Sequence, residues 1–391
     1  MTQNIPNRIR QVPESPISEA YGWLGARPDH RSDSLLDVSQ AVPGYPPPPE
    51  LQKAIGEAAL DASVSRYTDQ LGIAPLREAL AGEMTTLYGA DLRSDQIAIT
   101  AGCNQAFCLL MSTLCEHGDE VVLALPYYFN HDMWLRLQGI EPVYFPCRAG
   151  MLPHPDDAAA VLTERTRAVV LITPNNPTGA CYPPELLEAF YDLCAERGIT
   201  LAVDETYRDF RETTDAPHAL FHRSDWANTL VHLYSFSKVF SITGYRTGAL
   251  VAHPDLLFQM AKGMDCVAIC APHIGQRAAL HGLEALHDWR EKNRQRMMRR
   301  IELFRAGMKE RPGGFEMASS GAYFAYVRHP FEGQTSTAVG RALAQQHEIL
   351  SLAGSMFGPG QDDYLRLAFA NLSRERIERL LERLANVQLS K

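Results

Sequence analysis

The feature that most constrains the fold is an alternation of short β-rich runs with helical stretches between residues 95 and 253. Residues 168–173, Ala-Val-Val-Leu-Ile-Thr, are apolar nearly throughout and lack the every-second-residue pattern of a half-exposed strand. Such strands are typical of a parallel sheet buried on both faces. The sequence therefore predicts an α/β fold with a mostly parallel central sheet sandwiched by helices. The expected strands are residues 96–100, 120–125, 143–146, 168–173, 200–204, 230–235 and 247–253.

Changes in composition predict the domain organisation. The proline-rich run at residues 43–49 is typical of a stiff extended connector, which ends an N-terminal arm. After Leu286, a long charged helical stretch leads to two short strands and a final helix from Ser373. We expect an arm at residues 1–47 that forms part of a small domain, a large domain at 48–286 and a small α+β C-terminal domain at 287–391.

The formal charge of -9 and the pI near 5.8 give no reason to expect binding to nucleic acid or to a membrane surface. No segment has the apolar length of a signal peptide or membrane span, so we expect a cytoplasmic protein with small-molecule partners. The eight cysteines form no Cys-x-x-Cys pair, and the 13 histidines show no ligand spacing. We expect buried free thiols and no metal.

The segment from Ser235 to Arg246 reads Ser-Phe-Ser-Lys-Val-Phe-Ser-Ile-Thr-Gly-Tyr-Arg and follows an expected strand. Open α/β sheets bind ligands at the carboxyl ends of their strands. Lys238 can form an imine with an aldehyde cofactor, while Ser235, Ser237 and Arg246 supply donors for a phosphate dianion. The alternative interpretation is a surface lysine in a polar loop.

Two further polar motifs follow expected strands: Asn-Asn-Pro-Thr-Gly at 175–179 and Asp-Glu-Thr-Tyr at 204–207. Asp204 can form an ion pair with the ring nitrogen of pyridoxal phosphate (PLP) and keep that nitrogen protonated. Asn176 and Tyr207 can donate hydrogen bonds to the phenolic oxygen of the ring. Alternatively, the first motif is an ordinary turn and Asp204 caps another.

Together, in this order, the motifs resemble those of the class I/II, fold-type I family of PLP-dependent aminotransferases, over nearly the whole chain. The resemblance implies PLP held as a Schiff base on Lys238, with Lys238, Asp204 and Tyr207 as catalytic residues. It makes the large domain the PLP-binding domain and brings the arm to the substrate pocket. The implied reaction moves an amino group from an L-amino acid to a 2-oxo acid, such as 2-oxoglutarate, by a ping-pong mechanism.

The resemblance also implies contacts to the cofactor. Residues 101–106 lie between a strand and a helix, so the backbone amides of Gly102, Cys103 and Asn104 are expected to bind the phosphate. Tyr128 takes the place of the aromatic that stacks on the ring, with a core aromatic as the alternative. Tyr67 matches the tyrosine that reaches the phosphate of the neighbouring subunit. A homodimer with shared active sites is therefore expected.

Substrate contacts follow from the same resemblance. Arg366 lies in an apolar strand, a costly position that suits a clamp for the substrate α-carboxylate. An internal salt bridge is the alternative. Ala41 stands where many family members have glycine, which narrows the approach to the substrate. No arginine occurs between Gly263 and His273, where the aspartate-specific enzymes hold a second carboxylate.

The missing arginine and Tyr21 in the arm favour a donor with an aromatic or apolar side chain. One alternative function is another PLP-dependent reaction on amino acids, such as β-elimination, decarboxylation or oxidation. The other is an aminotransferase-like ligand-sensing regulator, which would need an attached DNA-binding module. The acidic charge and the short arm argue against that module.

Overall fold

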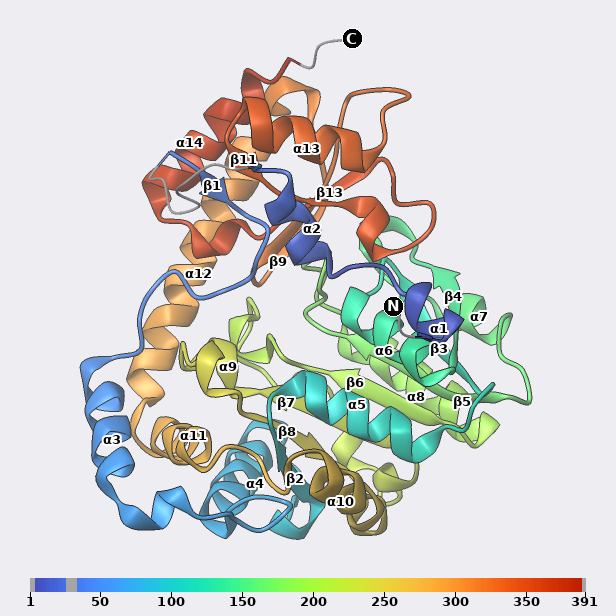
Figure 1. Cartoon of the computed structure of the whole chain (residues 1–391), viewed down its shortest axis with the longest axis vertical. Coiled ribbons are helices and arrows are strands. Elements are labelled where there is room, and N and C mark those ends of the chain that lie inside the picture. The colour runs from blue at the N-terminus through green and yellow to red at the C-terminus, as the bar shows by residue number, and fades with distance from the viewer. Residues whose placement is uncertain (1–3, 26–33, 389–391) are drawn as a thin grey trace.

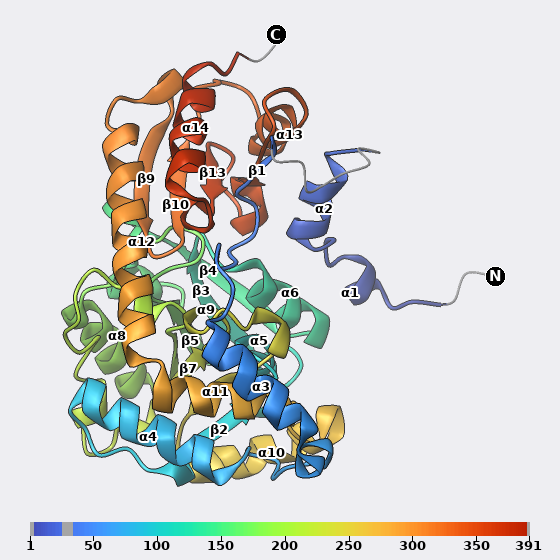
Figure 2. The ribbon, with the colours of Figure 1, turned by 90° about the vertical axis from the view of Figure 1, so that its left-hand side faces the viewer.

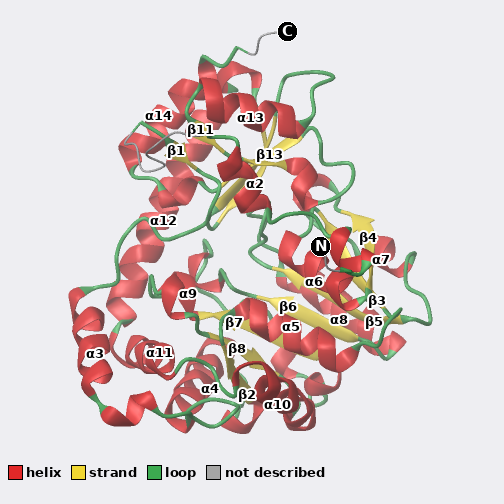
Figure 3. Ribbon diagram, in the orientation of Figure 1, coloured by secondary structure: helices red, strands yellow, loops and turns green. Residues whose placement is uncertain are grey.

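A computed structural model describes residues 4–25 and 34–388 of the chain. A seven-stranded sheet with the order β2-β8-β7-β6-β5-β3-β4 forms the lower part of the molecule in Figures 1 and 3. All neighbouring strands are parallel except β8, which runs antiparallel to both β2 and β7. The predicted mostly parallel sheet is confirmed. Its strands are β2 (Ile97–Thr100), β3 (Glu120–Leu125), β4 (Glu141–Pro146), β5 (Thr166–Ile172), β6 (Thr200–Asp204), β7 (Leu230–Ser235) and β8 (Gly248–Val251).

Helices cover both faces of this sheet, which explains why its strands are apolar throughout. In β5, Val169 and Leu171 join one hydrophobic core, whereas Ala168 and Val170 join a second core on the other face. The first face carries α3 (Pro49–Leu60), α4 (Ala74–Tyr88), α7 (Pro155–Ala159), α8 (Pro184–Arg197), α9 (Phe236–Val239) and α11 (His273–Ala285). The second carries α5 (Cys103–Leu114), α6 (Phe129–Gln138) and α10 (Pro254–Ala268).

A four-stranded antiparallel sheet with the order β12-β13-β10-β9 forms the upper part of the molecule. Beside it, β1 and β11 form a two-stranded parallel sheet, which joins the N-terminal arm to the upper part. The elements are β1 (Leu36–Asp37), β9 (Glu316–Gly321), β10 (Phe324–Arg328), β11 (Ile349–Leu350), β12 (Leu352–Ala353), β13 (Tyr364–Leu367), α12 (His287–Met308), α13 (Ser336–Gln346) and α14 (Arg374–Ala385).

Helix α12 connects the two parts and runs vertically in Figure 2. Near its start, Arg290 forms ion pairs with Glu83 and Asp209 of the lower part, at 2.5 and 2.6 Å. Farther along, Ile301 and Phe304 are buried in the core of the upper part. One continuous helix is therefore anchored in both parts.

The two parts also meet where the loop after β5 crosses the β9–β10 hairpin. A Cβ atom added to Gly179 would lie 2.3 Å from the backbone nitrogen of Gly321, and one added to Gly321 would lie 2.3 Å from the carbonyl oxygen of Gly179. Real Cβ atoms do not approach so closely, so only glycine fits on either side of this crossing.

The described part of the arm forms two short helices, α1 (Asn7–Arg10) and α2 (Pro16–Gly22), which lie along one side of the molecule in Figure 2. Trp23, at the end of α2, packs in a cluster with Tyr326 and Phe357 of the upper part. Across the described residues, no helix is both long enough and apolar enough to cross a bilayer.

Candidate active site

A cavity of about 170 Å³ lies at the carboxyl ends of β2, β3, β5, β6 and β7. A larger cavity of about 600 Å³, between α4 and the start of α12, has no lysine or cysteine in its lining. The smaller cavity is lined by both a lysine, Lys238, and a cysteine, Cys103. Ten residues predicted from the sequence line it: Cys103, Asn104, Tyr128, Asn176, Asp204, Tyr207, Ser235, Ser237, Lys238 and Arg246.

Lys238 is the third residue of the short helix α9, which directly follows β7. The hydroxyl oxygen of Ser235 caps this helix by accepting the backbone N–H of Ser237 at 3.3 Å. Burial, together with the positive charges of Arg246 and Arg366, lowers the pKa of Lys238 to about 8. A substantial fraction of this amine is neutral near physiological pH, as a nucleophile or base requires.

Asp204 lies across the cavity as a buried acid without a cationic partner among the described residues. Its carboxylate accepts the backbone N–H of Thr206 at 2.9 Å and lies 3.5 Å from the Cys103 sulfur. His131 Nε2 is 3.9 Å away, but burial lowers the pKa of His131 to about 3, so that ring is neutral. Burial raises the pKa of Asp204. A protonated ring nitrogen would supply the missing partner.

The start of α5 faces the same cavity. Gly102 precedes the helix with φ +86°, and a Cβ atom there would lie 2.3 Å from Arg246 Nη2, so glycine leaves room for the guanidinium. The amide of Gly102 donates to the carbonyl of Thr100 at 2.8 Å. The first-turn amides of Cys103 and Asn104 have no acceptor within the helix, which suits an anion such as a phosphate.

The thiol of Cys103 is not suited to act as a nucleophile. Burial and the nearby Asp204 raise its pKa well above the usual value. The thiol therefore stays protonated and can donate its weak hydrogen bond to Asp204.

Two tyrosines border the cavity. Tyr207 is buried and packs against the rings of Tyr323 and Phe324, with centroids 5.6 and 5.1 Å away. Burial raises its pKa well above the usual value, so its hydroxyl remains a donor. The hydroxyl of Tyr128 donates to Asn130 at 2.7 Å, and burial raises its pKa to about 12.

Arg366 is buried in β13 and is joined to the cavity through Asn176. Its Nη1 donates to the Asn176 side-chain oxygen at 3.0 Å, and its Nη2 donates to the carbonyl of Ser39. Its Nε has no hydrogen-bond partner among the residues that the structure describes. Within residues 4–25 and 34–388 no carboxylate pairs with it, so the internal salt bridge is absent there. Burial lowers the pKa of Arg366 to about 10.

Five predicted residues do not line the cavity: Gly102 and Arg366, described above, and Ala41, Tyr21 and Tyr67. The carbonyl of Ala41 accepts a hydrogen bond from Lys238 Nζ, which brings the arm to the site. The hydroxyl of Tyr21 donates to Asp37 at 2.5 Å. Tyr67 lies outside the cavity and is 75% exposed.

Sequence reasoning missed some lining residues. Ile172, Thr206 and Thr243 border the cavity, and the last two lie inside motifs that were already recognised. No sequence pattern indicated that His131 lies beside Asp204, because this position depends on the stacking of the His131 ring on Phe107, with centroids 3.8 Å apart.

The expectation for the cysteines was partly wrong, because Cys181 and Cys266 are exposed. In the described part of the chain, no three His, Cys, Asp or Glu side chains gather as metal ligands would.

Residues 34–384 match the model of the family described as aminotransferase class I and II. The chain belongs to this aminotransferase family. It is 30% identical over 349 residues to an aromatic aminotransferase of Arabidopsis thaliana, covering 86% of this chain and 85% of that protein. It is 26% identical over 378 residues to an aspartate aminotransferase of Pyrococcus horikoshii, covering 96% of this chain and 95% of that protein.

The protein also resembles the solved structure of a Thermotoga maritima aspartate aminotransferase, with a TM-score of 0.89 and 24% sequence identity. The match covers 98% of this chain and 98% of that chain. The predicted fold-type I architecture is thereby confirmed. The aminotransferase family is PLP-dependent. The residues present fit this cofactor, since the cavity combines an unpaired buried acid, a lysine of lowered pKa and a glycine that makes room for Arg246.

Proposed function

We propose that this aminotransferase binds PLP at Lys238 and transfers an amino group from an aromatic or apolar L-amino acid to a 2-oxo acid, such as 2-oxoglutarate, by a ping-pong mechanism. The observation that carries the proposal is the placement of Lys238 and Asp204 in one cavity. The amine of Lys238 has a lowered pKa, and Asp204 has no cationic partner in the described part of the chain. PLP needs such an amine and such an acid.

When bound, PLP would supply an electron sink for the carbanion left by loss of the α-proton. Asp204 would hold the ring nitrogen protonated, while Asn176 and Tyr207 would donate to the phenolic oxygen. Lys238 Nζ would hold the cofactor covalently and, once released, accept the α-proton. Tyr128 would cover one face of the ring.

The phosphate would be held by donors that converge from two strand ends. The amides of Cys103 and Asn104 face the cavity from the start of α5, with Gly102 giving the loop its shape. Ser235, Ser237 and Arg246 would complete this set. Such charge-assisted hydrogen bonds are short and strong, so they would also fix the position of the ring.

Arg366 would bind the α-carboxylate, since its planar guanidinium offers two parallel donors. The other cations of the site, Lys238 and Arg246, have roles of their own. In the described residues of one chain, the cavity and its border hold no further cation for a second carboxylate. This supports an apolar donor.

The apolar cluster that borders the site supports the same donor class. It brings Tyr21 and Tyr128 together with Phe129 and Phe357. The guanidinium carbon of Arg366 lies 5.2 Å from the centre of the Phe357 ring, so an apolar side chain would continue from the carboxylate clamp into this cluster. Ala41 would narrow the entrance.

The assembly that we propose is a homodimer with shared active sites. Tyr67 would reach the partner's phosphate, and its exposure is shared by Leu60, Phe258 and Val267 of the lower part. Residues 48–286 would form the large PLP-binding domain and residues 287–391 the small domain. Residues 1–47 would serve the small domain and substrate pocket.

The test is a screen of single amino acids against holoenzyme without an acceptor. Transamination yields one equivalent of pyridoxamine phosphate and one equivalent of the donor's 2-oxo acid. In a second step, a different 2-oxo acid is added as the acceptor and should restore PLP. Release of ammonia or carbon dioxide with PLP unchanged would instead indicate elimination or decarboxylation. A regulator would bind PLP and convert no donor.

A further inference from the structure

The side chain of Cys103 contacts the acid of the site, although the proposed reaction gives that side chain no role. Its sulfur lies 3.5 Å from Asp204 Oδ2, and both residues are buried. Cys103 is also the first residue of α5, whose first-turn amides would bind the phosphate. One residue therefore lies at both ends of the proposed cofactor site, with its amide toward the phosphate and its thiol toward the ring nitrogen's partner.

The two carboxylate oxygens of Asp204 have different donors. Oδ1 accepts the backbone N–H of Thr206 at 2.9 Å. Oδ2 lies near the Cys103 sulfur and, at 3.9 Å, near His131 Nε2, which is too far for a hydrogen bond. The thiol is therefore the hydrogen-bond donor that Oδ2 has in the described part of the chain.

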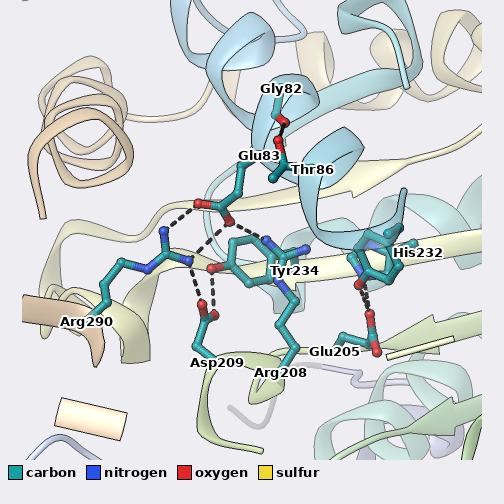
Figure 4. A network of polar contacts seen from close by, with 10 residues as sticks. Gly82, Glu83, Thr86, Glu205, Arg208, Asp209, His232, Tyr234 and Arg290 are labelled. Atoms are coloured by element: carbon teal, nitrogen blue, oxygen red, sulfur yellow. Dashed lines mark hydrogen bonds and ion pairs between the residues drawn. The ribbon is translucent and has the colours of Figure 1, made fainter. Parts of the chain in front are cut away.

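The charged groups that follow Asp204 in the sequence are engaged on the other face of the sheet. Glu205 faces α4 and lies 2.8 Å from His232 Nε2, as Figure 4 shows. In the same view, Arg208 donates to Glu83 at 2.7 Å. Neither contact reaches the cavity. On the cavity side, neutral donors hold the Asp204 carboxylate.

Such donors matter because a buried ion pair can become neutral when its proton moves from the cation to the anion. Burial raises the pKa of Asp204 and so favours this transfer, whereas hydrogen bonds from Thr206 and from the Cys103 thiol lower the pKa. A donor to the carboxylate stabilises its charged form. It would therefore oppose movement of the proton from the ring nitrogen of PLP to Asp204.

We infer that the Cys103 thiol donates to Asp204 and thereby keeps their shared proton on the ring nitrogen of bound PLP. The thiol is then a positioning group, which acts through Asp204 and does not touch the reacting atoms. An alanine at this position would remove the donor, whereas a serine would keep one. The placement of the proton rests on the proposed function, but the hydrogen bond does not.

The hydrogen bond can be tested in the apoprotein. The infrared difference between wild type and Cys103→Ala isolates the S–H stretching band of Cys103. A hydrogen bond to a carboxylate lowers the frequency of this band, and an amide is a weaker acceptor than a carboxylate. The same difference taken in an Asp204→Asn background should therefore show the band at higher frequency. An unchanged band overturns the inference, whether or not the protein transaminates.

In the holoenzyme, ¹⁵N-labelled PLP reports where the shared proton lies. The ring nitrogen should be protonated in wild type, and its signal should move toward that of the unprotonated form in Cys103→Ala. Cys103→Ser should return the signal toward wild type. Single-turnover α-proton abstraction in Cys103→Ala should fall about threefold to tenfold, as expected for the loss of one neutral hydrogen bond. KM for the donor should stay within about twofold.

Cys108→Ala is the matched control, because it makes the same substitution on the same helix at a side chain outside the cavity lining. Its ring-nitrogen signal and its rate should match wild type. The inference is overturned by an equal change in Cys108→Ala, by an unchanged signal in Cys103→Ala, or by a serine variant that behaves like the alanine variant. Failure of wild type to bind PLP defeats the proposed function and leaves the infrared result to decide the hydrogen bond.

Discussion

The Nζ atom of Lys238 donates a 2.5 Å hydrogen bond to the carbonyl oxygen of Ala41, a residue 197 positions away in the sequence. The contact joins the proposed cofactor lysine to the arm that leads into the upper part of the molecule. An amine held in this way is kept inside the site when it is not bonded to another group. The arm thus helps to place the reactive atom.

Replacing Lys238 with alanine should abolish turnover while PLP still binds, because the phosphate and ring contacts remain. Borohydride reduction of wild type followed by peptide mapping should place the pyridoxyl group on Lys238. Lys262→Ala is the control, since this lysine contacts Gln259 and Phe258 outside the cavity, and the variant should retain activity. A label on another lysine would contradict the assignment.

The reactivity of Lys238 should depend on pH with a midpoint near 8, where its pKa lies because of burial, Arg246 and Arg366. Only the neutral amine attacks an aldehyde, so the rate at which apoprotein captures pyridoxal should rise through that pH and then level off. Pyridoxal lacks the phosphate that Arg246 would bind. Arg246→Gln removes a positive charge and should move the midpoint upward. A wild-type midpoint near that of free lysine would refute the pKa assignment.

Asp204→Asn should keep the fold yet slow α-proton abstraction by several orders of magnitude, because an amide cannot hold the ring nitrogen in its protonated form. Single-turnover mixing of holoenzyme with donor measures the step directly. Asp209→Asn, which alters an acid paired with Arg290 outside the cavity, should leave the rate near that of wild type. Near-normal rates in Asp204→Asn would rule out its role.

Arg366→Lys should lower kcat/KM, and the decrease should correspond to a loss of about 2–4 kcal/mol in the free energy of transition-state binding. The reason is that an ammonium cannot reproduce the two parallel donors of the guanidinium. Half-reaction rates with an amino acid and with the corresponding amine, which lacks the carboxylate, separate the effect. Only the half-reaction with the amino acid should become slower in the variant. If kcat/KM stayed the same for every substrate, the clamp would lie elsewhere.

Mixed dimers test the proposed shared site. When Lys238→Ala and Tyr67→Ala chains are unfolded, mixed and refolded, about half of the dimers contain one chain of each kind. Each mixed dimer then has one site with both residues intact, so activity should approach about a quarter of wild type. Mixed dimers confirmed by mass, with activity no higher than the average of the two variants, would exclude a contribution of Tyr67 to the partner.

Much of the fold followed from the sequence, because buried parallel strands are apolar and end at polar motifs. The expected strands at 120–125, 200–204 and 230–235 coincide with β3, β6 and β7. Asn176, Asp204 and Lys238 lie at or just after the carboxyl ends of neighbouring strands. Because these ends share one edge of the sheet, the order of the strands is enough to bring the three residues together.

Other contacts depend on packing that no local pattern encodes. The arm contributes only the two-residue strand Leu36–Asp37, because after it the chain turns to the contacts of Ser39 with Asp37 and Arg366. The bond from Arg366 to Asn176 crosses between the two parts of the molecule. The proposed position of Tyr67 at a partner's phosphate would depend on a second chain.

The facing glycines, Gly179 and Gly321, limit how this protein can be recombined. A chimaera that takes residues 287–391 from a relative keeps Gly179, so the incoming segment must bring a glycine to position 321, and the reverse exchange has the same requirement. Any side chain at either position would force the loop that carries Asn176 away from the hairpin. Because Asn176 bonds to Arg366, shuffled libraries should lose activity in step with the loss of this glycine pair, even where every proposed active-site residue is retained.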